Sequence, residues 1–273
     1  LLLILELYLF ELKLSAKDDE NNQVGLRFDM QAPNMGQGYI DARIDPQNQP
    51  YQINGAMLLE KVNLAMFKPF FPAIRHLSGE MNLAGGLTGE ITKPDFYGEF
   101  SLNDGEILAK NAPLDFSHTQ IKASIRGKQA TINGQLNSGQ GLAQLKGDMS
   151  WQDIPQLNLN IDGKRLEFAQ KPLFKAKVSP NLQLQIKPYT ISLKGDALVE
   201  DALLNPQKLS DKAIPLSADV RVIDLSAPDR IRVAKAMRQW DINADINLRM
   251  GDNVVFNGFG VQSKLTGELK LQE

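Results

Sequence analysis

The alternation of aliphatic and polar residues along most of this chain restricts what it can fold into. Residues 157–162, 182–187 and 242–250 place an apolar residue at every second position, with polar or charged residues between them. Because successive side chains of a β-strand point to opposite faces, each run predicts a strand with one apolar and one polar face. A sheet of such strands must either fold over its apolar face or use that face to hold an apolar ligand.

Composition excludes several classes of function. The chain has 273 residues, of which 42% are hydrophobic and 23% charged, and its formal net charge is -2. This balance is ordinary for a folded protein and provides neither the basic face that nucleic acid requires nor a polybasic membrane patch. The chain contains no cysteine, so it has no disulfide framework and no cysteine metal site.

The first ten residues are almost wholly apolar, but they do not predict a membrane helix. Such a helix needs about 20 apolar residues, and Glu6 and Glu11 interrupt this run. No basic start or small-residue cleavage site indicates a signal peptide. Apolar residues recur at every second position and then change phase, which predicts two strand pieces with a break between them. The chain lacks an initiator Met, and we expect an excerpt of a longer protein whose targeting segment lies outside it.

The remaining pattern predicts about 15 strands and one short helix. Residues 63–72 fit a helix with a capping Asn63 and a proline stop at Pro72. Such a helix could plug one end of the β-structure, or it could contact a partner or a membrane. The predicted strands cover 24–30, 39–45, 51–59, 79–90, 95–103, 106–110, 115–126, 129–137, 142–151, 156–169, 173–187, 189–200, 216–224, 241–250, 253–259 and 261–272.

Turns and two longer interruptions separate these strands. Residues 103–105, Asn-Asp-Gly, fit a hairpin turn. Residues 201–215 are polar and contain proline, which predicts a loop. Residues 228–240 are basic and mildly amphipathic, and could form an exposed loop or a segment that docks a partner. Glycines recur within and beside the strands, where they permit bulges and strong curvature.

We find no pattern of catalytic or metal-binding residues. His76 and His118 are the two histidines, and neither has the spacing of a metal-ligand pair. No nucleophile elbow, phosphate-binding loop or dinucleotide fingerprint occurs in its required context. Carboxylates fall on the polar phase of strands, where solvation explains them. We therefore expect no enzyme, no metal and no cofactor.

The candidate functional residues are the aliphatic phase itself. This phase could form the core of an ordinary β-sandwich or barrel, or it could line a trough for acyl chains, whose burial is worth about 0.8 kcal/mol per methylene. Leu and Ile dominate it, with few large aromatic residues to fill a closed core. The candidate lipid-groove residues are Phe96, Phe100, Leu102, Ile121, Ile125, Leu136, Leu145, Leu157, Leu159, Ile161, Leu182, Leu184, Ile186, Ile191, Leu193, Ile242, Ile246, Leu248, Val261, Leu265 and Leu269.

Several phrases of the sequence resemble the TamB family. Residues 77–89 and 93–105 follow the recurrent pattern G-x-L-x-x-G, a short gap, a proline, and G-x-x-x-L-x-x-G. The helical segment before them and residues 178–182 are also similar to TamB, and 251–269 match best. The resemblance covers roughly 51–273, and residues 228–240 depart from it.

This resemblance implies an all-β fold: an elongated, curled, taco-like sheet with an apolar interior and one short helix. It implies a TamB-like C-terminal β-taco domain at 51–273, with 1–50 as preceding strands of the same sheet and an artificial N-terminal boundary. It also implies a periplasmic part of an inner-membrane-anchored protein of a Gram-negative bacterium, with the anchor outside this chain. The implied partners are phospholipid acyl chains and a TamA-like outer-membrane protein of the Omp85 type.

Three functional hypotheses follow. The first is a conduit that moves phospholipid between the inner and outer membranes and supports outer-membrane protein assembly. The second is a chaperone-like scaffold that binds through its sheet edges by β-strand augmentation without carrying lipid. The third is a glycan-active or adhesive β-protein, which the low aromatic content of 7% disfavours.

Overall fold

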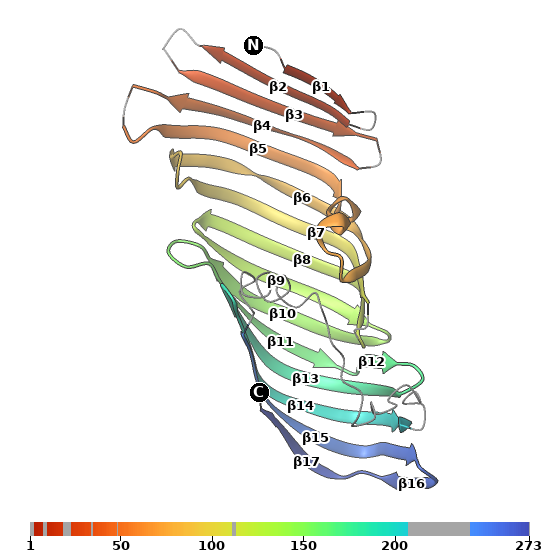
Figure 1. The fold of residues 1–273 in the computed structure, drawn as a ribbon. Helices are drawn as coiled ribbons and strands as arrows, with labels where there is room; N and C mark the ends of the chain where they lie inside the picture. Colours follow the sequence, from red (N-terminus) through yellow and green to blue (C-terminus); the bar gives the residue numbers. More distant parts are fainter. Residues whose placement is uncertain are drawn as a thin grey trace, which may run out of the picture.

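Alternating apolar and polar residues form seventeen strands of one sheet (Figure 1), so the all-β prediction is confirmed. The computed structural model describes residues 3–7, 10–18, 23–33, 35–47, 49–110, 113–206 and 241–272, with side chains from residue 23 onward. The strands of the first half are β1 (Leu3–Leu7), β2 (Phe10–Asp18), β3 (Val24–Ala32), β4 (Gly36–Asp45), β5 (Gln52–Asn63), β6 (Ile74–Glu90), β7 (Asp95–Ala109), β8 (Asp115–Gly127) and β9 (Gln129–Ser138). Those of the second half are β10 (Gly141–Ser150), β11 (Gln156–Lys164), β12 (Leu166–Gln170), β13 (Phe174–Lys187), β14 (Thr190–Leu204), β15 (Asp241–Gly258), β16 (Val261–Lys264) and β17 (Gly267–Gln272).

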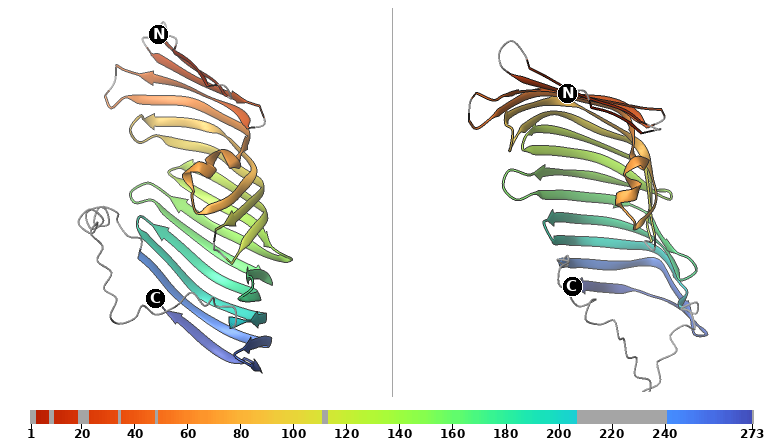
Figure 2. Two further views of the ribbon diagram at one scale, coloured as in Figure 1. Left: turned by 45° about the vertical axis from the view of Figure 1, so that its right-hand side comes forward. Right: turned by 45° about the horizontal axis from the view of Figure 1, so that its top comes forward.

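Most strands pair with their neighbours in sequence, as in an antiparallel meander. Antiparallel pairs run without interruption from β1 to β11. Both β11 and β12 pair with β13, because together they form one interrupted strand. The exception is β14, which pairs in parallel with β15, so the described ends at Pro206 and Asp241 lie at opposite ends of these strands. The sheet stays open and curls rather than closing into a barrel (Figure 2).

The structure corrects several predicted boundaries. Residues 103–105 form no hairpin, because β7 continues through them as a bulge opposite β8. The loop predicted from residue 201 begins later, because β14 extends to Leu204. The two strands expected at 241–250 and 253–259 are one strand, whereas the one expected at 156–169 is interrupted at Arg165. The strand predicted at 216–224 and the segment 228–240 lie outside the described residues.

The predicted helix is a 3-10 helix, η1 (Leu64–Phe70). Asn63 caps it by accepting a hydrogen bond from the Ala65 amide at 2.9 Å. η1 packs beside β6 at the point where β5 has ended (Figure 1). It contributes no buried residue, and Phe70 and Phe71 are 76% and 50% exposed, so the plug interpretation gains no support from burial.

A line of bulges crosses the sheet and divides it into two walls. Lys61, Asp104, His118 and Arg165 take positive φ angles of 46–52°, a conformation that L-residues seldom adopt outside turns and bulges. Register shifts occur beside the first three of them, and a further shift leaves Glu200 of β14 unpaired. We call this line the crease, and its residues are Lys61, Gly79, Asp104, His118, Arg165 and Glu200.

Beyond the crease, strand ends form a smaller wall that we call the lip. An isolated bridge from Leu114 to Phe168 and a 2.6 Å hydrogen bond from the Ala169 amide to the Pro113 carbonyl join β8 directly to β12. The β9–β10 hairpin between them stops at the crease, where the Ser138 hydroxyl donates to the Glu167 carbonyl at 2.7 Å. The lip comprises 74–78, 105–109, 114–117, 166–170, 174–177, 201–204, 253–258 and 261–264. The remainder of the sheet is the main wall.

Candidate functional site: an apolar trough

The register of the strands places the predicted groove residues on one face of the sheet. Directly paired residues share a face, and successive pairs therefore trace rows across the main wall. One row runs Ile125, Ala130, Met149, Leu157, Ile186, Ile191 and Ile242. The next runs Phe100, Ala123, Ile132, Gly147, Leu159, Leu184, Leu193 and Ala244. The third runs Leu102, Ile121, Gly134, Leu145, Ile161, Leu182, Gly195 and Ile246.

The other predicted residues lie on this face nearer its borders. Phe96 belongs to a row close to the turns, opposite Gly127. Leu136 faces Ala143, and Leu248 faces Leu269, on the side of the crease. Leu265 packs against the buried cluster at the crease. Val261 lies apart from the rows, on the exposed strand β16 opposite Gly258.

The opposite face of the same strands is polar. The row between two apolar rows consists of Lys122, Asn133, Lys146, Asn160, Gln183, Lys194 and Asp245. Amide and carboxylate side chains on this face bond across strands, as Asn158 does to Asp148 at 3.0 Å and Gln185 does to Asn158 at 3.0 Å. Because the polar side chains lie on the opposite face, the apolar face offers no polar side chains for hydrogen bonding.

No second layer covers the apolar face of the described strands, as Figure 2 shows. Among the described side chains, fifteen hydrophobic residues are buried, and eight of them are alanines, whereas a closed core of this size would bury mainly Leu, Ile and Phe. The large aliphatic side chains of the rows are mostly half-buried. The face is therefore a trough with accessible hydrocarbon walls, rather than the interior of a sandwich.

The crease is the most completely buried part of this face. Val62, Leu77, Leu102, Leu166 and Val254 lie beside it and are nearly inaccessible. Their burial follows from the main wall and the lip folding toward each other, with η1 packed against β6 at one end of the crease. Val254 also anchors the described buried cluster, with Ala176, Val199 and Ala202.

The lip contributes apolar residues that the sequence analysis did not include. Register and packing place them on the same face as the buried residues Leu77 and Val254, and they are richer in Phe than the main wall. They are Leu77, Ile107, Leu114, Phe116, Phe168, Phe174, Leu204 and Phe256. Each bulge shifts the alternation, so a strict period of two does not connect these residues to the rows of the main wall.

Charged residues reinforce the crease from its polar side. The Arg165 guanidinium donates to Glu200 and, at 2.7 Å, to Asp201, and the Arg165 backbone amide donates to the Ser179 hydroxyl at 2.9 Å. The Asn253 amide donates to Asp201 at 3.1 Å, which is the largest cause holding the pKa of that carboxyl below its usual value. Hydrogen bonds to Glu200 and Asp201 raise the pKa of Arg165. This network joins β13, β14 and β15 across their bulges.

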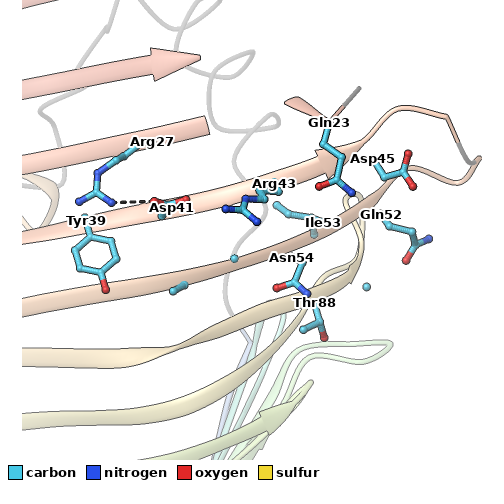
Figure 3. A pocket seen from close by; sticks show the side chains of 13 residues that line it. Gln23, Arg27, Tyr39, Asp41, Arg43, Asp45, Gln52, Ile53, Asn54 and Thr88 are labelled. Carbon is cyan, nitrogen blue, oxygen red and sulfur yellow. Dashed lines mark hydrogen bonds and ion pairs between the residues drawn. The ribbon is translucent and has the colours of Figure 1, made fainter. Parts of the chain in front are cut away.

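A separate hollow of about 810 Å³ lies mainly over the polar face of β3–β6 (Figure 3). Arg27 bonds Asp29 at 2.9 Å and Asp41 at 2.8 Å, and its guanidinium lies 4.8 Å from the centre of the Tyr39 ring. These hydrogen bonds raise the pKa of Arg27. The charge of Arg27 is therefore already paired, whereas Arg43, which also lines the hollow, makes no ion pair among the described residues.

The described residues show no metal centre and no membrane-crossing helix. No cluster of three metal-ligating side chains occurs among them, and none of the helices within the described ranges is long and apolar enough to span a bilayer. The His76 Nε2 atom lies 3.3 Å from the Glu106 Oε2 atom on the lip, and His118 belongs to the crease; among the described residues neither histidine is part of a cluster of three metal-ligating side chains.

An open β-sheet with one continuous apolar face and one polar face defines a class of elongated trough proteins. Sequence models place this chain in a family within that class: the TamB C-terminal domain matches residues 129–273, and the TamB N-terminal domain matches 4–102. The chain belongs to the TamB family. Strands β7 and β8 cover most of the interval between the two matches and belong to the same sheet.

A characterised relative has the same family name. Over 276 residues, the chain is 22% identical to the translocation and assembly module subunit TamB of Haemophilus influenzae. The match covers 98% of this chain and 21% of that relative, so the chain spans about a fifth of the relative's length. No solved structure matches the fold.

Proposed function

We propose that this chain is a segment of a phospholipid conduit, in which acyl chains lie on the apolar face of the trough. The observation that carries the proposal is the uninterrupted aliphatic surface with no covering layer among the described strands. The thirteen main-wall strands from β3 onward, at about 4.8 Å spacing, extend this surface for about 60 Å. Each methylene removed from water contributes about 0.8 kcal/mol, so one acyl chain can be held without any specific polar contact.

The family relationship supports a cellular location and a partner for this conduit. We infer that it lies in the periplasm of a Gram-negative bacterium, in a protein anchored in the inner membrane by a segment outside this chain. It would move phospholipid between the inner and outer membranes. An Omp85-type outer-membrane protein resembling TamA would be its partner, and outer-membrane protein assembly would depend on both. The chain would act without a cofactor and without catalysis.

Lipid extraction and photocrosslinking test the conduit. Purified chain is analysed by native mass spectrometry, and a photoreactive residue is placed at Leu184 or Ile246, which belong to neighbouring apolar rows. Co-purified phospholipid with crosslinks from both positions is expected. A lipid-free protein that gives no crosslinks after incubation with phospholipid would contradict the conduit.

Charge substitutions provide a matched control. Leu184→Asp and Ile246→Asp place an uncompensated carboxylate against acyl chains, which is costly, and should abolish lipid recovery. Gln185→Asp and Asn247→Asp place the same charge on the polar face of the same strands, and should leave recovery unchanged. Equal recovery from all four folded variants would show that the apolar face does not carry the lipid.

The second candidate is a scaffold that binds by β-strand augmentation. It is favoured by β17, whose residues are all exposed and which pairs, among the described strands, only with β15. A strand with an unpaired edge can extend its sheet with a strand of another protein. Proline substitutions at the outward-facing amides of β17 would abolish such binding and leave lipid recovery intact.

A further inference from the structure

The hollow over β3–β6 lies mainly on the face opposite the apolar trough, and a row of polar side chains crosses it. Arg43 of β4 pairs with Asn54 of β5, which pairs with Thr88 of β6, and directly paired residues share a face (Figure 3). All three side chains are exposed, and none has a hydrogen bond or ion pair to another described residue. The hollow therefore presents donors and acceptors that the described part of the protein does not use.

The neighbouring row of the same face is almost free of side chains at its centre. Asp41 pairs with Ala56, Ala56 with Gly86, and Gly86 with Tyr97. A Cβ added at Gly86 would have one neighbour within 4 Å, the Gly55 carbonyl oxygen at 3.4 Å. The strands that carry Asp41 and Tyr97 are three spacings apart, which is about 14 Å. Ala56 and Gly86 thus form a low floor between larger side chains.

Two of the chain's five tyrosines flank this floor. Tyr39 lines the hollow, with the Arg27 guanidinium 4.8 Å from the centre of its ring, and Tyr97 is 52% exposed. Aromatic rings with a polar tip suit ligands that have both apolar and polar surfaces, as sugar rings do. The aromatic content of 7% disfavours glycan binding by the sheet as a whole, but it averages over this local pair of tyrosines.

The charges of the hollow favour a neutral ligand. Two cations and two carboxylates line it: Arg27, Arg43, Asp41 and Asp45. A hydroxyl group both donates and accepts, so a polyhydroxylated ligand can pair with guanidinium, amide and carboxylate groups alike. A small anion only accepts hydrogen bonds and would be repelled by both carboxylates.

The strands beneath the hollow offer no free edge to a peptide strand. Each of β3, β4, β5 and β6 is paired with a strand on both sides. A ligand must therefore be held by side chains and cannot be held by extending the sheet.

We infer that the hollow over β3–β6 binds a neutral saccharide chain. Arg43, Asn54 and Thr88 provide the hydrogen bonds, and the sugar rings lie over the floor of Ala56 and Gly86. A chain of N-acetylated hexosamines carries hydroxyl and amide groups, and so supplies the mixture of donors and acceptors that these side chains require. This site is on the other face from the acyl chains, and it does not depend on the proposed lipid conduit.

Titration of the purified chain with tetra-N-acetylchitotetraose, followed by nuclear magnetic resonance, tests this site. We expect saturable binding. Arg43→Ala removes a donor and Ala56→Gln extends a side chain over the floor, so each should weaken binding at least about tenfold, equivalent to about 1.4 kcal/mol. Circular dichroism confirms folding, and the exposed Arg43 provides the decisive variant if Ala56→Gln fails to fold.

Two control variants should bind the saccharide with wild-type affinity. Gln183→Ala removes a polar side chain from the same face of the distant strand β13. Leu184→Asp, which should abolish lipid recovery, changes the opposite face, so the saccharide site and the conduit can fail separately.

Three results would overturn the saccharide site. The first is no saturable binding of the tetrasaccharide at millimolar concentration. The second is equal affinity for the wild-type chain, Arg43→Ala and Ala56→Gln, which would place binding elsewhere. The third is displacement of the saccharide by an equal concentration of inorganic phosphate, which would indicate an anion site.

Discussion

At the scale of single residues, glycine has different roles on the two faces of the sheet. Gly85 and Gly98 are paired on the apolar face, and the Phe96 ring lies over both. A Cβ at Gly85 would lie 2.5 Å from the Tyr97 carbonyl oxygen and 2.6 Å from the Phe96 ring. A Cβ at the next residue, Gly86, has one neighbour within 4 Å, the Gly55 carbonyl oxygen at 3.4 Å. The close approach of Phe96 therefore requires glycine on one face only.

Alanine substitutions of these adjacent glycines should have opposite effects. Gly85→Ala should lower the free energy of unfolding by about 1–3 kcal/mol, the usual cost of overpacking a well-packed site. Gly86→Ala should leave it unchanged or raise it by about 0.4–1 kcal/mol, because alanine restricts the unfolded chain. Denaturant unfolding followed by circular dichroism measures both. Equal destabilisation would mean that Phe96 does not pack over Gly85.

The carboxyl of Asp201 should make the crease sensitive to acid. Its folded-state pKa is depressed below 3.8, chiefly by the Asn253 amide and also by Arg165. Stability from such a group is present above the unfolded pKa and is lost as the pH falls through the folded pKa. Asp201→Asn should therefore flatten the fall in Tm below about pH 4. Glu99→Gln, at an exposed carboxylate with no ion pair in the described ranges, should keep the wild-type profile, and identical profiles for all three proteins would contradict this role.

At the scale of elements, the alternation of apolar and polar residues predicts the strands, but a strict period of two does not predict the crease. In β14 the apolar phase falls on Ile191, Leu193 and Val199, and then, after Glu200, on Ala202 and Leu204. This change from odd to even positions is readable in the sequence and marks the bulge. Apart from Val261 and Leu265, the predicted groove residues nevertheless end before the bulges, because a strict period of two excludes the residues beyond them. The hairpin predicted at 103–105 is wrong because Asn-Asp-Gly also suits a bulge with a positive φ.

Residues at the crease should contribute more to the free energy of unfolding than residues in the rows of the trough. Leu102 is 6% exposed at the crease, whereas Leu269 is 50% exposed on the apolar face of β17. Leu102→Ala should cost about 2–5 kcal/mol, as for other buried leucines. Leu269→Ala should cost less than about 1 kcal/mol, because little of its surface leaves water on folding. Similar costs in denaturant unfolding would indicate that a further layer covers the trough.

At the scale of the whole molecule, the local sequence pattern determines which strands are neighbours, but it does not determine whether the sheet closes. The antiparallel order follows from short turns, which favour pairing of consecutive strands. The parallel pairing of β14 with β15 depends instead on residues far apart in the sequence, and no local signal announces it. Whether the apolar faces close into a sandwich or stay open also depends on the sum of many contacts. The predominance of Leu and Ile in the rows favours the open form, and the structure shows that form.

Solution scattering should distinguish the open sheet from a compact protein of equal length. A compact chain of 273 residues has a radius of gyration of about 19 Å. A slab with a length of about 70 Å, a width of about 45 Å and a thickness of about 15 Å has a radius of gyration of about 24 Å. Small-angle X-ray scattering of the monomeric chain should give the larger value, with and without bound phospholipid, because the crease and not the ligand holds the two walls. A value near 19 Å would show that the apolar face closes on itself in solution, as in the sandwich interpretation, and would remove the surface on which the proposed conduit depends.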